Sequence, residues 1–201
     1  MASEIDVCNL ALAHLGDDAT VASIDPPEGS AQAEHCARFY PIARDALLEL
    51  HSWGFASRRI RLALLSSGWP EWEYAYAQPA DALNILAVLP DGVTDDYQPQ
   101  EFACEIDDNG AQVIYTDQPD AALRYTALVT DTTRFSPLFV TALSWHLASM
   151  LAGPILKGET GAAESQRCAK MAQAYLAQAK ESDANQRRAR PTHTPPWLGV
   201  R

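Results

Sequence analysis

The chain has 201 residues, of which 47% are hydrophobic and 20% charged, and its formal net charge is −11. This composition is that of a folded globular protein and excludes disorder along the whole chain. The length suffices for one core, or for one core with an inserted second unit. The acidic balance excludes a general nucleic-acid binder, because binding to phosphates requires a clustered cationic surface.

The charge is distributed unevenly along the chain. Residues 186–201 contain Arg187, Arg188, Arg190 and Arg201 and no acidic residue. The rest of the chain has 11 basic against 26 acidic residues, a net charge of −15. An acidic body with a basic end indicates two different surroundings for the two parts.

The beginning of the chain has neither the basic flank nor the apolar region of a signal peptide. No apolar run reaches the roughly 18 residues of a membrane-spanning helix. We therefore expect synthesis in the cytoplasm and no membrane partner. The four cysteines are too far apart for a CxxC metal or redox pattern, so reduced structural thiols are expected at Cys8, Cys36, Cys104 and Cys168.

Two helices are predicted in the first fifty residues. Ser3 is a suitable N-cap for a helix over residues 3–15, and Gly16 ends it. A second helix is predicted over residues 30–50, with a kink at Pro41 or, alternatively, a break into two helices there. Its apolar stripe consists of Cys36, Tyr40, Ala43, Leu47 and Leu50.

The next segment is rich in aromatic residues, which are Trp53, Phe55, Trp69, Trp72, Tyr74 and Tyr76. The favoured interpretation is one small aromatic core at a junction of helix and sheet. The alternative is a base-stacking surface with Arg58, Arg59 and Arg61, which would need a basic field. Acidic residues nearby argue against such a field: Glu71, Glu73 and Asp81.

Strands are predicted at residues 57–65, 83–89, 101–106, 111–116 and 121–128. Asn109-Gly110 between two of these runs is a strong hairpin signal, and we interpret the adjacent Asp107 and Asp108 as a solvated turn. A helix over residues 136–156, with Ser136 as cap and Pro137 at the first position, and an alanine-rich helix over 159–185 follow. The alanines indicate either close helix packing or high helix propensity.

These elements predict an α+β fold. Residues 1–56 and 131–185 form a helical domain, residues 57–130 form a β-rich insertion, and residues 186–201 form an extended basic tail. The predicted binding residues lie on that tail, where arginines precede an apolar pair: Arg187, Arg188, Arg190, Trp197 and Leu198. Docked on a partner, each apolar side chain contributes roughly 1.5–3 kcal/mol before ordering costs.

We find no catalytic, cofactor-binding or metal-binding set in the sequence. None of the motifs HExxH, GxSxG or GxxxxGK[ST] occurs. His35 and Cys36 are adjacent on a helix and so point in different directions. His146 stands on an apolar helix, where a core or interface histidine is favoured over a ligand.

Several short runs occur in an order shared with a known family. They are Val7–Gly16, Cys36–Pro41, Arg44–Leu48, His51–Ala56, Tyr74–Pro79, Ala80–Leu83, Thr130–Thr132 and Phe135–Phe139. In this order, over roughly residues 4–180, the chain resembles the tail tubular protein A family of short-tailed phages, the adaptor between the portal and the tail.

The resemblance implies a structural virion protein and not an enzyme, with no cofactor. It implies a ring of twelve copies below the portal protein, a platform for the tail nozzle and in some members for tail fibres, and a lumen through which DNA passes as cargo. We expect the helices at 30–50, 136–156 and 159–185 to supply the ring contacts and the basic tail to grip the portal.

Other functions remain open at this point. A head-completion or stopper protein of a longer-tailed phage is the nearest one. A small helical binding module with a basic docking tail is the second, and an enzyme using His146 or the pair His35–Cys36 is the third.

Overall fold

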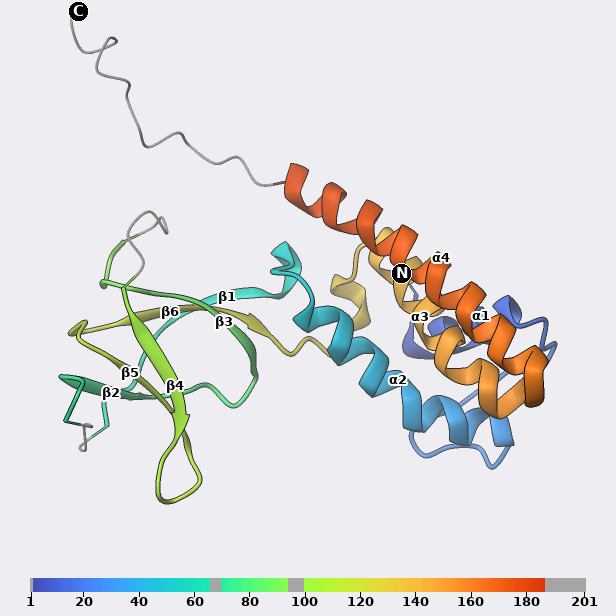
Figure 1. Cartoon of the computed structure of the whole chain (residues 1–201), viewed down its shortest axis with the longest axis horizontal. Helices are drawn as coiled ribbons and strands as arrows, with labels where there is room; N and C mark the ends of the chain where they lie inside the picture. Colours follow the sequence, from blue (N-terminus) through green and yellow to red (C-terminus); the bar gives the residue numbers. More distant parts are fainter. Residues whose placement is uncertain (1, 66–69, 94–99, 187–201) are drawn as a thin grey trace, which may run out of the picture. The chain divides into compact units, whose positions relative to one another are not determined.

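The computed structural model describes residues 2–65, 70–93 and 100–186. The described chain has the predicted α+β fold, with four α-helices and two small antiparallel sheets (Figure 1). It divides into a helical unit, residues 1–56 and 128–184, and a β unit that comprises residues 57–127. Residues 128–130 belong to the helical unit, whereas the sequence analysis assigned them to the insertion.

Helix α1 (Glu4–His14) begins at a capping box, in which Ser3 and Asp6 bond each other's backbone N–H groups. Helix α2 (Ala31–Glu49) continues through Pro41, so the alternative of two separate helices is wrong. Leu50 is 57% exposed and not part of the core, although its backbone is still helical and its N–H donates to the carbonyl of Ala46. The other members of the predicted stripe are buried.

Helix α3 (Pro137–Leu156) begins at the predicted cap, where Ser136 accepts a hydrogen bond from the backbone of Phe139. Helices α1 and α2 both pack against α3. By length and composition α3 could cross a membrane, contrary to the expectation that no segment could do so. Half of it is buried in this structure, which is typical of the core helix of a globular protein.

Helix α4 (Gly158–Asn185) follows α3 after a single residue, Lys157. Its buried positions recur at intervals of seven and four residues and are Gly161, Cys168, Ala172, Ala179 and Asp183. Only two of its eight alanines are therefore buried. Helix propensity explains most of the alanines, and close packing explains the buried ones.

The β unit contains two three-stranded sheets. In the first, the order is β1 (Ser57–Arg61), β6 (Ala122–Ala127) and β3 (Ala82–Leu89). In the second, the order is β2 (Tyr74–Ala77), β5 (Gln112–Thr116) and β4 (Phe102–Ile106). Two isolated bridges, Leu64–Tyr76 and Val88–Gln100, connect the sheets.

The strand predictions are correct in kind and differ in extent. Strand β1 ends at Arg61 rather than at residue 65, and β2 is absent from the predicted set of strands. The predicted hairpin joins β4 and β5, and Gly110 in its turn has φ of +81°. That left-handed conformation is the reason for a glycine there.

The aromatic residues do not form one core. Trp53 and Phe55 pack with Phe139 in the helical unit, with ring centroids 5.0–5.2 Å apart. Tyr76 belongs to the main core of the β unit, and Trp72 packs on a small cluster on the other face of β5. The prediction of one core at the junction is therefore wrong, and Trp69 lies outside the described residues.

Candidate functional site at the end of helix α4

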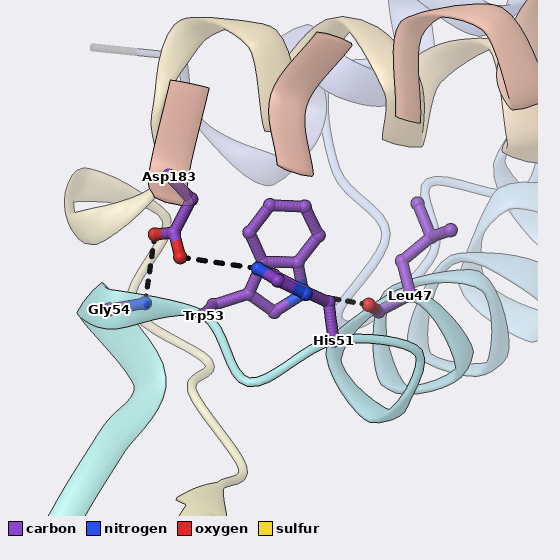
Figure 2. Close-up of polar contacts among 5 residues, drawn as sticks. All are labelled: Leu47, His51, Trp53, Gly54 and Asp183. Atoms are coloured by element: carbon purple, nitrogen blue, oxygen red, sulfur yellow. Dashed lines mark hydrogen bonds and ion pairs between the residues drawn. The ribbon is translucent and has the colours of Figure 1, made fainter. Parts of the chain in front are cut away.

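Asp183 anchors the end of α4 to the corner that follows α2 (Figure 2). Its Oδ1 accepts a hydrogen bond of 2.8 Å from the backbone N–H of Gly54, and its Oδ2 lies 3.3 Å from Nε2 of His51. The Asp183 side chain is only 9% exposed. We call these three residues the α4 anchor. It fixes the position from which the C-terminal segment continues.

The corner that receives Asp183 is itself rigidly packed. The indole of Trp53 is fully buried, and its Nε1 donates a hydrogen bond of 2.9 Å to the carbonyl of Leu47 in α2 (Figure 2). The ring of His51 meets the edge of Trp53, with centroids 4.8 Å apart. The Trp53 side chain thus joins the end of α2 to Phe139 of α3 in the core of the helical unit.

Gly54 permits the close approach of Asp183. A Cβ atom at this position would lie 3.1 Å from Oδ1 of Asp183, which is tighter than ordinary van der Waals contact. A side chain here would require the carboxylate to shift by a few tenths of an ångström, which would alter its hydrogen bond with this N–H. The glycine therefore belongs to the anchor through its shape as well as its backbone.

A carboxylate beside an imidazole is also part of many catalytic sites. In this case the other carboxylate oxygen accepts the backbone N–H of Gly54, so both oxygens of Asp183 have partners within the helical unit. Nowhere in residues 2–65, 70–93 and 100–186 do three or more histidine, cysteine or acidic side chains gather to hold a metal ion. The contacts of Asp183 hold the end of α4 against the corner that follows α2.

Sequence reasoning missed the anchor, although a signal was present. Asp183 continues the spacing of the buried positions Cys168, Ala172 and Ala179, so a charged residue falls on the buried stripe of α4. A charge on a buried stripe requires a partner. The partner itself lies 129 positions earlier in the chain, and no local pattern identifies it.

The predicted binding residues Arg187, Arg188, Arg190, Trp197 and Leu198 lie outside the described residues. The structure describes the chain up to Gln186, one residue beyond the end of α4. The anchor is therefore the last described feature before them.

The residues proposed for an unrecognised enzyme site are not brought together. Cys36 is buried against Cys8 of α1, and the hydrogen bond between the two thiols and their burial raise the pKa of Cys8. His35 instead lies near Phe39, with ring centroids 6.4 Å apart. Burial lowers the pKa of His146, because it disfavours the charged ring.

A second polar cluster joins α1, α3 and α4. The ring of His14 stacks on Trp145, with centroids 3.6 Å apart, and its Nε2 lies 3.1 Å from Oγ of the buried Ser144. Arg167 donates a hydrogen bond to the carbonyl of His14 and lies over the Trp145 ring. Burial, and then the charge of Arg167, lower the pKa of His14.

The arginines of the alternative base-stacking surface are engaged within the β unit. Arg58 pairs with Asp81 at 2.6 Å, and Arg61 pairs with Asp91 at 2.7 Å. These ion pairs cancel much of the positive field that stacking on nucleic acid would require.

No protein-family model matches this sequence, and no curated protein matches it either.

Proposed function

We propose that this protein is a head-to-tail adaptor of a short-tailed phage. In this function, a ring of copies lies between the portal protein and the tail nozzle, and DNA passes through its lumen. The protein is then a virion component that is assembled in the host cytoplasm. The proposal rests on the resemblance of its motifs and on how those motifs pack.

One observation carries the proposal: two of these motifs lie far apart in the chain and pack against each other. The run His51–Ala56 meets the run Phe135–Phe139, because Phe55 lies 5.6 Å from Phe135 and 5.2 Å from Phe139 between ring centroids. Such packing explains why these runs would occur together in one family.

The charge distribution is compatible with this function. An acidic lumen would repel DNA phosphates, so DNA would slide without binding, within the screening length of about 8 Å. The basic residues at the C-terminal end would meet acidic groups or carbonyl groups of the portal. Twelve acidic copies repel one another, so the ring contacts must be apolar or hydrogen-bonded.

Native mass spectrometry of the full chain, alone and mixed with the portal protein of the same phage, tests the proposal. We expect a large ring of defined stoichiometry on the portal. A chain that ignores the portal would contradict the adaptor function and favour the small binding module.

A deletion tests the site on the tail. A chain without residues 186–201 should keep its far-ultraviolet circular dichroism spectrum and lose portal binding. Portal binding that is unchanged by the deletion would contradict the assignment of Arg187, Arg188, Arg190, Trp197 and Leu198 as the portal-binding residues. The double substitution Trp197→Ala/Leu198→Ala separates the apolar contribution from that of the arginines.

A further inference from the structure

The β unit has an open groove where its two sheets separate. The groove has a volume of about 410 Å³ and lies between β3 and β4, which are edge strands of different sheets. The two strands meet at one end, where the N–H of Gln100 donates a hydrogen bond of 2.9 Å to the carbonyl of Val88. Beyond this bridge they do not pair.

Exposure of both strands increases away from that bridge. Along β3 the residues near Val88 are buried, whereas Asn84 is exposed. Along β4 exposure increases from Phe102 to Ile106. Within 82–86 and 102–106, all of which are described, no hydrogen bond joins the two strands. Both edges therefore present backbone groups on which an added strand can pair.

An apolar row continues from the core into this groove. Phe102, Cys104 and Ile106 alternate along β4 and so face the same side of the sheet. Phe102 packs against the main core of the β unit, but Ile106, at the end of the row, is 69% exposed. Leu83 and Ile85 line the opposite wall. Apolar side chains line both walls of the groove, and no described side chain covers Ile106 at its end.

The surroundings of the groove are acidic. Residues 100–121 contain no lysine or arginine and six acidic residues, which are Glu101, Glu105, Asp107, Asp108, Asp117 and Asp120. Glu105 also lines the groove, and its side chain alternates to the face of β4 opposite Cys104 and Ile106. A second copy of β4 is therefore a poor occupant, because its charges have the same sign. The groove fits an extended segment that is basic and carries apolar side chains.

We infer that the occupant is the chain's own C-terminal segment, residues 187–201. This segment holds four arginines and no acidic residue. Residues 197–201, Trp-Leu-Gly-Val-Arg, contain no proline and are equal in number to the five residues of β4. Trp197 or Leu198 would cover Ile106, and the arginines would meet the acidic residues that flank the apolar row along β4 and its turn.

The segment is long enough to reach the groove of its own chain. Fifteen residues extend to about 50 Å, of which a five-residue strand uses only about 17 Å. The segment begins four residues after Asp183, and Asp183 is bonded to Gly54, which precedes β1 by three positions. A short tether gives an effective concentration of about a millimolar, which favours the chain's own segment over that of another copy.

In a free subunit the groove then holds the residues that the proposed function assigns to the portal. Portal binding would have to displace these residues from the groove. Rings would therefore form only on the portal and not among free subunits. Occupancy of the groove stands without the proposed function, because it can be measured on the protein alone.

Cys104 reports on the groove, because it lines the groove and is exposed, whereas the other three cysteines are buried. We would measure the alkylation rate of Cys104 by iodoacetamide in the full-length chain, with peptide mapping. Trp197→Ala/Leu198→Ala should raise this rate at least threefold, and a synthetic peptide of residues 187–201 should lower it again. Leu10→Lys, an exposed apolar site on α1, serves as the control and should leave the rate unchanged. Equal rates in the full-length chain and the double variant would overturn the inference.

A cross-link identifies the source of the segment. In Leu198→Cys, diamide should oxidise the thiols of residues 198 and 104 to a disulfide, while diamide itself is reduced to the hydrazine. A cross-linked monomer on a non-reducing gel is the expected result, and adding Cys104→Ser should abolish it. A cross-linked dimer would overturn the intramolecular assignment, and no cross-link would overturn occupancy of the groove.

Discussion

Asp183 accepts a hydrogen bond of 2.8 Å from the backbone N–H of Gly54, although 129 positions separate the two residues in the chain. The bond joins the last turns of α4 to the corner between α2 and β1. It thereby closes the helical unit, which is built from both ends of the chain. The C-terminal segment continues from a fixed point as a result.

Removing the anchor carboxylate should destabilise the helical unit. Asp183→Ala leaves the Gly54 N–H without its acceptor, so we expect a loss of about 1–3 kcal/mol in the free energy of unfolding. His51→Ala should cost less, because its contact is longer, at 3.3 Å. Urea denaturation measures both values. Glu181→Ala, an exposed site on the same helix, is the control. Equal effects of Asp183→Ala and Glu181→Ala would contradict the anchor.

Gly161 should be intolerant of any side chain. A Cβ atom there would lie 2.9 Å from the carbonyl oxygen of Ala152, so α3 and α4 would have to separate. We expect Gly161→Ala to cost about 1–3 kcal/mol, as overpacking does, despite a gain of about 1 kcal/mol in helix propensity.

Ala163→Gly, at an exposed site one half-turn further on, calibrates the propensity of this helix. It should cost about 1 kcal/mol. A Gly161→Ala variant that is more stable than the parent by that amount would contradict close packing at Ala152. Thermal unfolding of both variants at one pH provides the comparison.

The features that depend on neighbours in the chain could be predicted from the sequence. Ser3 and Ser136 cap helices because a hydroxyl before a helical run satisfies free N–H groups, and both positions are confirmed. The hairpin at Asn109-Gly110 is also confirmed, because its turn signal likewise lies in neighbouring residues. Periodicity also placed Leu50 in the core, and there it failed because a stripe does not show how much of a helix its neighbours cover.

The features that depend on contacts between distant residues could not be predicted. Strand β2 has four residues, and its pairing with β5 is set by partners almost forty positions away. The anchor requires Asp183 and Gly54 to meet, and only the charge on the buried stripe indicated that a partner was needed. The groove exists because two edge strands diverge, which no sequence period encodes.

Stability should fall as the pH is lowered from 7.5 to 5.5. The pKa of His14 is lowered below its ordinary value of 6.5 by burial and by Arg167, and that of His146 is lowered by burial. The unfolded chain therefore binds more protons than the folded one in this window, and unfolding is favoured as the pH falls. In His14→Gln/His146→Gln the unfolding free energy should depend less on pH. An unchanged pH profile in this double variant would contradict the assignment.

The exposed face of α2 should take part in ring assembly if the proposed function is correct. Ile42 lies within the continuous helix α2, and this large apolar side chain is 54% exposed. Burying one such side chain in an interface contributes about 1.5–3 kcal/mol, which is about a tenfold or greater change in each contact. Ile42→Asp should therefore weaken the ring on the portal in native mass spectrometry, while the unfolding free energy of the subunit changes by only about 0.5 kcal/mol. Val93→Asp, an exposed apolar site on the β unit, is the matched control and should leave the ring intact. A full ring formed by Ile42→Asp at the parent concentration would exclude this part of α2 from the ring contacts. Leu50, the exposed residue at the C-terminal cap of α2, would then be the next residue to test.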